Sequence, residues 1–263
     1  MALYDPVNGV YRKVSNKYDP VDGVYRKVKA AYDPVDGVYR KYLSSGGVGS
    51  LAVGDSVWLN VDGTLTEFLV VHQGNPDSAL YDESCNGTWL LWKNEYVTTD
   101  FGFQDNRDLT YWLIYSLQDM FADAFDSNVE AAIKQAKIPY YDPNSGEITN
   151  GVMDSATKFF LLSGYEVGFT TANSPYLPVD GACLDYFSGA TNAADIWSYY
   201  IWALRSAVTN SAYNIWAIKY DGTLKSYSTE GKYYGGTTFA IRPAFILDSN
   251  TPIDNSTGIN IIA

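Results

Sequence analysis

The sequence predicts an α+β fold of short antiparallel strands, two central helices and long loops. Residues 56–71 alternate apolar and polar side chains on both sides of an Asp-Gly pair, which is the pattern of a β-hairpin. Residues 109–125 carry apolar side chains at helical spacing, and an Asp-Ser-Asn sequence at residues 126–128 predicts the start of a second helix that runs to Lys137. Further strand-like runs lie at residues 89–92, 158–162, 214–219 and 239–247.

The composition indicates a folded, acidic protein. The chain has 263 residues, of which 46% are hydrophobic, so it can bury a sizeable core. A net charge of -12 makes nucleic acid a poor partner, because phosphate contacts need clustered Lys and Arg, and it disfavours an anionic membrane for the same reason. No apolar run is long enough to span a bilayer, and the first residues lack the pattern of a signal peptide. Neither nucleic-acid binding nor membrane insertion is therefore expected.

Residues 1–43 contain three copies of one unit, Tyr-Asp-Pro-Val-Asn/Asp-Gly-Val-Tyr-Arg-Lys, with a period of fourteen residues. Each Asp-Pro pair can start a helical turn, with Arg-Lys near its end, where a helix dipole favours cations. The glycine in each unit leaves an extended, turn-rich structure as the alternative. A unit this short cannot bury a core alone, so the segment is either a tether or a strip that packs against a partner. The repeated Val and Tyr residues favour attachment or oligomerisation.

Residues 44–54 are rich in Ser and Gly and predict a linker, which leaves residues 55–263 as the main domain. The charge divides at the same place. Residues 1–42 carry eight Lys or Arg against five Asp, which leaves ten basic and twenty-five acidic residues for the remainder. The N-terminal segment and the main domain are therefore of opposite charge.

The sequence offers little for catalysis or for a cofactor. His72 is the only histidine, no Gly-x-Ser-x-Gly motif accompanies it, and a structural role is favoured. One histidine with two distant cysteines, Cys85 and Cys183, makes no zinc pattern, and the two thiols fit either a disulfide or separate buried positions. Residues 142–147 gather oxygen ligands but depart from the calcium loop of EF-hands, so a surface turn is favoured. We therefore predict no enzyme, no metal and no cofactor.

Residues 202–247 differ from the rest because their ends are apolar while their middle is rich in Tyr, Ser, Asn, Gly, Thr and Lys. Tyrosine supplies rigid contact area at low entropic cost, and the small polar residues supply adaptable hydrogen bonding. Antibody loops have this composition, so it favours recognition over chemistry. Tyr213, Tyr227 and Tyr233 are the candidate contact anchors.

Several segments resemble the variable proteins of diversity-generating retroelements, in a phage-associated branch from gut bacterial communities. The likeness covers nearly all of the chain. Besides the N-terminal repeats it includes Thr-Glu-Phe-Leu-Val-Val-His-Gln-Gly at residues 66–74, Ser-Cys-Asn-Gly-Thr-Trp-Leu-Leu at 84–91, Leu-Leu-Ser-Gly-Tyr-Glu-Val-Gly at 161–168 and Pro-Val-Asp-Gly-Ala at 178–182. The resemblance implies a C-type-lectin-like fold related to that of formylglycine-generating enzymes.

The resemblance also implies a variable region at about residues 202–243. In that family a reverse transcriptase copies a template with errors at adenines, so that Asn codons become codons for Tyr, Ser, Asp, Thr, Gly and others without giving stop codons. The scaffold residues of the region would be Trp216, Gly222, Leu224, Arg242 and Pro243. The variable, ligand-binding positions would be Val208, Asn210, Tyr213, Asn214, Ala217, Lys219, Tyr220, Thr223, Lys225, Tyr227, Glu230, Tyr233 and Tyr234.

The chain departs from the family pattern in two respects. Ala203 and Ala207 stand where the family often has Trp and Pro in a Trp-Trp-Leu-Arg-Ser-Pro sequence. Four residues of the region are not reachable from Asn codons by adenine changes alone, namely Lys219, Lys225, Glu230 and Lys232. The sequence also lacks the closely spaced cysteine pair that formylglycine-generating enzymes use for catalysis, so catalysis by that route is not expected. It lacks the Glu-Pro-Asn and Gln-Pro-Asp motifs with which calcium-dependent lectins bind sugars, so the lectin-like fold by itself does not imply a sugar ligand.

Together these observations predict a non-enzymatic ligand-recognition protein on a phage tail, which acts outside the cell on a host-cell surface protein or glycan. Residues 1–43 would join it to virion components or to copies of itself, in a homo-oligomer for which a trimer is one candidate. Two alternatives stay open. One is an enzyme that acts on cell-surface glycan through paired carboxylates, and the other is a structural protein that decorates the virion.

Overall fold

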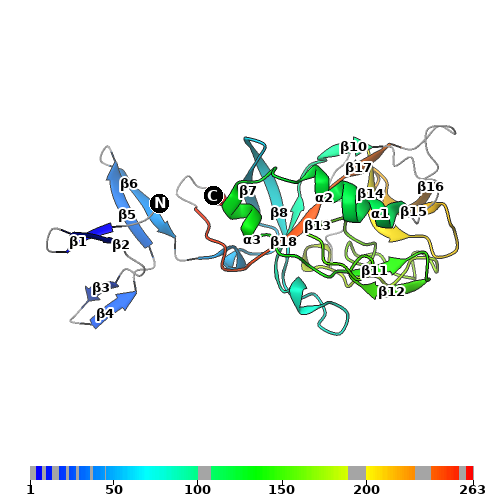
Figure 1. Cartoon of the computed structure of the whole chain (residues 1–263), viewed down its shortest axis with the longest axis horizontal. Helices are drawn as coiled ribbons and strands as arrows, with labels where there is room; N and C mark the ends of the chain where they lie inside the picture. The colour runs from blue at the N-terminus through cyan, green and yellow to red at the C-terminus, as the bar shows by residue number, and fades with distance from the viewer. Residues whose placement is uncertain are drawn as a thin grey trace.

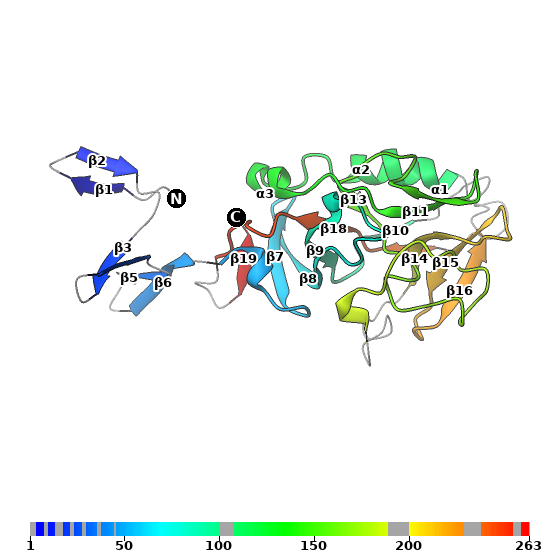
Figure 2. The same cartoon turned by 90° about the horizontal axis from the view of Figure 1, so that it is seen from below.

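The computed structural model of the chain describes residues 4–7, 10–13, 18–21, 24–27, 30–35, 38–44, 46–99, 108–188, 200–228, 238–254 and 259–262. The described part is mostly β, with one six-stranded sheet, one five-stranded sheet and four two-stranded hairpins (Figure 1). Its α-helices are short and lie along one side of the sheets (Figure 2). The predicted α+β class, a C-type-lectin-like domain with two central helices, is therefore wrong.

The two predicted helices are shorter than expected because the chain leaves the helical conformation early. The first, expected over residues 109–125, ends before Asp123, which has a left-handed φ of 61°. The second ends before Ile133, which is extended and pairs with Leu247, so the residues that lead to Lys137 contact strands instead of continuing a helix. The helical segments are α1 (Asp108–Tyr111), a π-helical turn (Trp112–Ser116), α2 (Leu117–Met120) and α3 (Ser127–Ala132).

The six-stranded sheet has the strand order β13-β18-β9-β8-β7-β19. Its strands are β7 (Ser56–Val61), β8 (Thr64–Gly74), β9 (Gly87–Trp92), β13 (Phe159–Phe160), β18 (Ala244–Leu247) and β19 (Asn260–Ile262). Neighbours are antiparallel except β7 and β19, which are parallel. The predicted hairpin of residues 56–71 is confirmed. Val61 pairs with Thr64, and the turn between them has left-handed φ angles at Asp62 (49°) and Gly63 (77°), as a type I′ turn requires.

The five-stranded sheet has the strand order β10-β17-β14-β15-β16. Its strands are β10 (Val97–Thr99), β14 (Ile201–Ala207), β15 (Asn214–Ile218), β16 (Leu224–Ser228) and β17 (Phe239–Ile241). The single strand predicted over residues 239–247 is in fact two strands, because Arg242 and Pro243 carry the chain from β17 in one sheet to β18 in the other. Proline has no amide hydrogen for a strand ladder, which fits a break at this point.

The three N-terminal repeats form hairpins, so the expected helical turns are wrong and the extended alternative is confirmed. In the first hairpin Val7 stands opposite Val10, and the other two repeat this register. The two residues between the paired valines are Asn-Gly or Asp-Gly, a strong sequence signal for a hairpin. The strands are β1 (Tyr4–Val7), β2 (Val10–Lys13), β3 (Tyr18–Val21), β4 (Val24–Lys27), β5 (Ala30–Val35) and β6 (Val38–Ser44). The fourth hairpin, β11 (Pro139–Asp142) with β12 (Glu147–Asn150), belongs to the main domain.

The glycine-rich segment predicted as a linker packs against the main domain from residue 46 onward. Val48 is fully buried, and its amide donates to the carbonyl of Thr251 at 2.8 Å. A Cβ on Gly47 would lie 2.3 Å from the carbonyl oxygen of Ser249, so only glycine fits this close approach. The nearby strands β7 and β19 lie at the end of the main domain opposite β15 and β16 in both views (Figures 1 and 2).

Aromatic side chains cover both faces of the six-stranded sheet. Phe159 and Phe160 are neighbours on β13, so they point to opposite faces and belong to separate buried clusters. On the face covered by the helices, Phe159 stacks on Phe125 with ring centres 5.7 Å apart. On the other face Phe160 lies edge-on to Trp89 at 5.3 Å, in a cluster that also contains Trp202 of β14. This second cluster therefore connects the two sheets.

A buried ion pair between Arg205 of β14 and Glu166 ties several parts of the main domain together. Both side chains are fully buried. Two guanidinium nitrogens donate to the two carboxylate oxygens, with Nη2 2.7 Å from Oε1. The same guanidinium donates to the carbonyl oxygens of Pro139, Leu161 and Asp180 at 3.2, 2.9 and 2.8 Å. One side chain thus holds β14, β11 and two loops in place.

Further hydrogen bonds satisfy the polar groups around this ion pair. The hydroxyl of Tyr81 donates to Glu166 Oε1 at 2.8 Å, and the amide of Ser163 donates to Oε2 at 2.9 Å. Ser206, also on β14, donates to the buried carboxylate of Asp180 at 2.9 Å. A buried charge pair is tolerated only when its remaining donors and acceptors are paired in this way, and removing one partner is strongly destabilising.

Replacing Arg205 with Met is expected to lower the free energy of unfolding by about 3–5 kcal/mol, because Glu166 is left buried without its charge partner. Urea denaturation measures this loss. Lys219→Met is the matched control, since it removes one partner of the solvent-accessible pair Lys219–Asp221, whose atoms are 2.7 Å apart, and should lower the free energy of unfolding far less. Equal losses of unfolding free energy in the two variants would show that the buried ion pair contributes no more to stability than the exposed one.

Candidate ligand-binding surface

The predicted variable region is built on β14, β15 and β16, at the end of the main domain away from β7 and β19 (Figure 2). Apart from the first residue of each, β14 and β15 are fully buried strands. Trp216, predicted as scaffold, is buried, and its indole nitrogen donates to the carbonyl of Tyr176 at 3.3 Å. Gly222, also predicted as scaffold, has a left-handed φ of 77° in the turn before β16. The two strands thus form a fixed support for the turns at their ends.

The structure places eight of the predicted variable residues at the surface of the main domain. They are exposed or half-buried, namely Asn210, Tyr213, Asn214, Lys219, Tyr220, Thr223, Lys225 and Tyr227. They come from the two turns that flank β15, from its first residue Asn214 and from the edge strand β16. Three others, Glu230, Tyr233 and Tyr234, lie outside the described residues.

Val208 and Ala217 are buried, which corrects their assignment to the ligand-binding surface. Val208 is 5% exposed and packs in the same cluster as Trp216. Ala217 is fully buried and pairs with Ala203 of β14. β15 is an inner strand of the sheet, covered on both faces, so a larger side chain at Ala217 has no room.

The turn between β15 and β16 is fixed by its own polar side chains. Lys219 Nζ lies 2.7 Å from one carboxylate oxygen of Asp221, and Thr223 donates to the other from its amide at 3.1 Å and its hydroxyl at 2.6 Å. The hydrogen bond from Lys219 holds the pKa of Asp221 well below its usual range. Tyr220 is 67% exposed, with Lys219 Nζ 5.3 Å from its ring centre. The turn therefore presents Tyr220 on a preformed loop, which lowers the entropic cost of binding.

The three candidate anchors differ in their surroundings. Tyr213 is 48% exposed at the turn before β15. Tyr227 on β16 is half-buried, with its ring edge-on to Phe239 at 6.0 Å between centres. Lys225 Nζ lies 5.7 Å from the centre of the Tyr227 ring. Tyr233 lies outside the described residues. Tyr213 is thus open to a ligand, whereas Tyr227 also contributes to the support.

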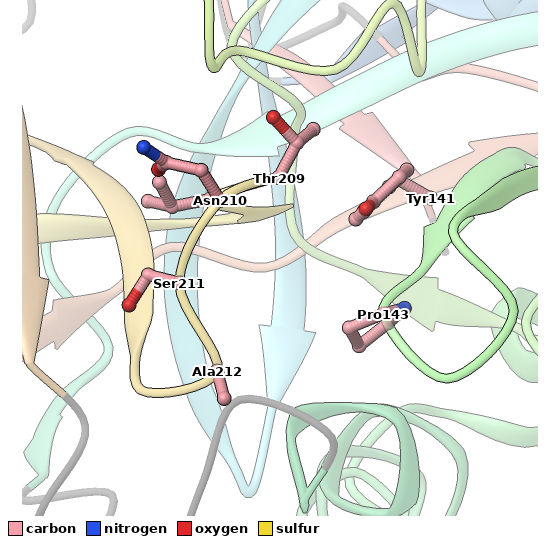
Figure 3. Close-up of a pocket in the computed structure, with 7 residues that line it drawn as sticks. Tyr141, Pro143, Thr209, Asn210, Ser211 and Ala212 are labelled. Carbon is pink, nitrogen blue, oxygen red and sulfur yellow. The ribbon is translucent and has the colours of Figure 1, made fainter.

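A pocket opens beside this surface, between the β11–β12 turn and the loop that follows β14 (Figure 3). Its volume is about 480 Å³. The lining residues are Tyr141, Pro143, Val208, Thr209, Asn210, Ser211 and Ala212. Figure 3 shows Tyr141 and Pro143 on one side of the pocket and the loop of residues 209–212 on the other. Of the lining residues, only Val208 and Asn210 belong to the predicted site.

Sequence reasoning missed Tyr141, Pro143 and Tyr176. The amide of Thr209 donates to the carbonyl of Tyr176 at 3.1 Å, so the loop that carries this half-exposed tyrosine lies against the loop after β14. A Pro-Asn-Ser-Gly turn at residues 143–146 is a local signal for a hairpin. No local signal places that hairpin beside β14, because the bond between them, from Arg205 to Pro139, spans 66 positions in the sequence.

The buried acidic side chains do not form an active site that a substrate can enter. Glu166 and Asp180 are fully buried, and Arg205 occupies the carboxylate of the first. His72, at the end of β8, is also buried, with Nδ1 2.9 Å from a carboxylate oxygen of Asp185. Burial lowers the pKa of His72, against the raising effect of the Asp185 charge. These contacts fit the structural role predicted for this histidine.

The cysteines and the acidic turn form neither a disulfide nor a metal site in the part of the chain that the structure describes. Cys85 is buried, Cys183 is exposed, and both are free thiols. The carboxylate of Asp142 accepts hydrogen bonds from the amide and the side chain of Asn144 at 2.9 and 3.0 Å, as in a surface turn. Among the described residues no three His, Cys, Asp or Glu side chains are grouped to hold a metal ion. In the same residues no helix has the length and apolar character to cross a membrane.

Comparison with known proteins identifies one family that this chain matches. A family model with the description "Domain of unknown function (DUF6273)" matches residues 57–249. The matched range includes the pocket and the predicted variable region and excludes the N-terminal repeats. Neither the curated proteins nor the solved structures gave a match. The family description assigns no activity, so the function has to be argued from the site.

Surface and support positions of the predicted variable set are expected to respond differently to substitution. Tyr220→Ser should change the free energy of unfolding by less than about 0.5 kcal/mol, because the side chain is exposed. Ala217→Tyr should cost more than about 2 kcal/mol or prevent folding, because the position is closed on both faces. Urea denaturation gives the free energy of unfolding of both variants. An Ala217→Tyr variant as stable as the natural protein would contradict the division into surface and support positions.

The pH dependence of stability is expected to contain a contribution from Asp180. Burial raises the pKa of its carboxyl to about 7, although Arg205 and Ser206 lower it. Between about pH 4 and pH 7 the folded carboxyl then holds a proton that the unfolded one has lost, so stability falls as the pH rises through this range. Asp180→Asn should remove that fall, so the stability of the variant relative to the natural protein should increase from pH 4 to pH 7. Parallel urea-denaturation profiles of the two proteins across this range would contradict it.

Proposed function

The chain belongs to the family described as a domain of unknown function (DUF6273), and we propose that it is a non-enzymatic ligand-recognition protein. The observation that carries the proposal is the separation between a buried support and an exposed edge. β14 and β15 are buried, whereas eight predicted variable residues lie exposed or half-buried in the turns around β15 and on β16. An exposed edge of this kind can change its side chains without changing the fold.

The chemistry of the exposed edge supports binding. Tyr213 and Tyr220 are exposed aromatic residues at opposite ends of β15, and Ser, Thr, Asn and Lys residues surround them. Tyrosine buries a large area on binding with few rotatable bonds, which is why it is common in antibody loops and at interface hot spots. The resemblance to variable proteins of diversity-generating retroelements fits the same function, with this edge as the diversified region.

Attachment through the N-terminal repeats completes the proposal. An isolated two-stranded hairpin is only marginally stable in water, so three hairpins in series favour a partner that adds strands or covers a face. The repeats carry the basic excess of the chain, whereas the main domain is acidic. We propose that residues 1–43 join the protein to virion components or to copies of itself, with a trimer as one candidate. The main domain would then act outside the cell, on a phage tail, against a host-cell surface protein or glycan.

Sequencing of this locus across a population of the same phage or host tests the proposal. Substitutions should concentrate at adenine-derived codons for the exposed residues of the turns and of β16. Codons for the buried residues between them, including Ala217 and Trp216, should stay fixed, since their side chains form the support. The exposed tyrosines Tyr111 and Tyr115 provide the matched control, because they are equally open to solvent but lie on the helical segment.

Two results would contradict the proposal. Uniformly low variation in the turns and β16 would remove the diversified surface and return attention to an enzyme or a structural virion protein. Equal variation at Tyr111, Tyr115 and the turn residues would indicate that exposure alone, without diversification, explains the pattern.

A further inference from the structure

The pocket between the β11–β12 turn and the loop after β14 is lined by apolar and neutral polar side chains, which limits the class of ligand that it can bind. Its volume of about 480 Å³ lies within the range of small-molecule sites, roughly 300–1,000 Å³. No lining residue carries a charge, and four of them, Tyr141, Thr209, Asn210 and Ser211, carry a neutral polar group. A charged ligand would give up its hydration here without meeting an opposite charge, which is costly. The lining therefore favours an uncharged ligand that carries several hydroxyl or amide groups.

The acidic side chain next to the pocket does not change this conclusion. Asp142 follows Tyr141, but its carboxylate is held by the amide and side chain of Asn144 in the β11–β12 turn. Burial and the charge of Asp142 raise the pKa of Tyr141, so its phenol stays neutral and can donate a hydrogen bond at neutral pH. Tyr141 thus offers a ring face and a neutral donor from one rigid side chain.

Two pocket side chains have unused hydrogen-bonding capacity. Within the described residues, no hydrogen bond engages the phenol of Tyr141 or the side-chain amide of Asn210. Figure 3 shows Tyr141 and Pro143 across the pocket from the loop that carries Asn210. A ligand between the two walls would therefore meet an apolar ring surface on one side and a polar loop on the other.

We propose that this pocket binds one neutral hexopyranose unit of a surface glycan, with the Tyr141 ring against the apolar face of the sugar. The inference rests on the proposed recognition function and specifies its ligand class. A pyranose has one C–H face and a rim of neutral hydroxyls, which matches an aromatic ring opposite a loop of Thr, Asn and Ser. A peptide is the competing ligand class, because β11, which carries Tyr141, is paired with β12 alone among the described strands, and a peptide backbone can add to a strand edge.

The two walls would have different parts in recognition. Tyr141 and Pro143 lie outside the predicted variable set, whereas Asn210, which is exposed on the loop wall, belongs to it. The hairpin wall would therefore keep the ligand class constant as a sugar, and changes in the loop wall would alter which sugar is preferred.

Saturation-transfer difference NMR on the full chain tests the inference, with glucose, galactose, mannose and N-acetylglucosamine as separate probes. At least one sugar should show transfer to its ring protons, and Tyr141→Ala should weaken its binding about tenfold or abolish it. Tyr141→Phe keeps the ring and should retain transfer, which separates loss of the site from loss of the fold. Tyr115→Ala, at a half-exposed tyrosine on the π-helical turn, is the matched control and should leave binding unchanged.

Three results would overturn the sugar assignment. The first is no transfer to any of the four sugars while an uncharged peptide probe such as acetyl-Gly-Pro-Tyr-Gly-amide shows transfer, the second is no transfer to the sugars or to the peptide, and the third is sugar transfer that Tyr141→Ala leaves intact. None of these affects the variation expected across the phage population, so failure of the sugar assignment is distinguishable from failure of the recognition proposal.

Discussion

The buried ion pair between Arg205 and Glu166 is the interaction on which the arrangement of the main domain depends. Its charges are out of reach of water, so every remaining donor and acceptor around them must find a partner inside the protein. That requirement fixes β14 against β11 through the carbonyl of Pro139 and against the loop of Asp180. β14 is in turn the strand from which the variable edge extends. The position of the proposed binding surface is therefore set by polar contacts in the interior, while apolar clusters supply most of the burial.

A support of this kind separates stability from recognition. The turn after β15 holds its shape through local contacts of Asp221 with Lys219 and Thr223. Substitution of exposed side chains in such turns should alter the surface more than it alters the fold. The pocket has one fixed wall and one wall that is predicted to vary. The β11–β12 hairpin is held to β14 by the hydrogen bond from Arg205 to Pro139, whereas the loop after β14 carries Asn210, a predicted variable residue. The proposed anchoring segment and the proposed recognition surface lie at opposite ends of the main domain, beside β7 and β19 and beside β15 and β16 (Figure 2).

Local chemistry in the sequence was sufficient to predict some elements and insufficient for others. The Asp-Gly pairs at residues 62–63 and 221–222 identify two hairpins, because Asp62, Gly63 and Gly222 adopt the left-handed angles that these turns require. The N-terminal repeats contain the same kind of hairpin signal, an Asn-Gly or Asp-Gly pair, but also Asp-Pro pairs that suit the start of a helix, so the local sequence does not decide between the two structures. The family resemblance implies that Ala217 is variable, and no pattern in the neighbouring sequence shows that β15 is an inner strand. Tyr141 was missed since its position in the pocket depends on pairing across the fold, which no short-range pattern contains.

Native-state hydrogen exchange is the measurement that tests the central claim most directly. If the ion pair holds a fixed support beneath an adaptable edge, the amides of β14 and β15 should exchange only through global unfolding. Those of the turns at residues 209–213 and 219–223 should exchange through small local openings, with much lower opening free energies. Exchange in β14 and β15 as fast as in the turns would contradict the account, because the edge would then have no rigid support.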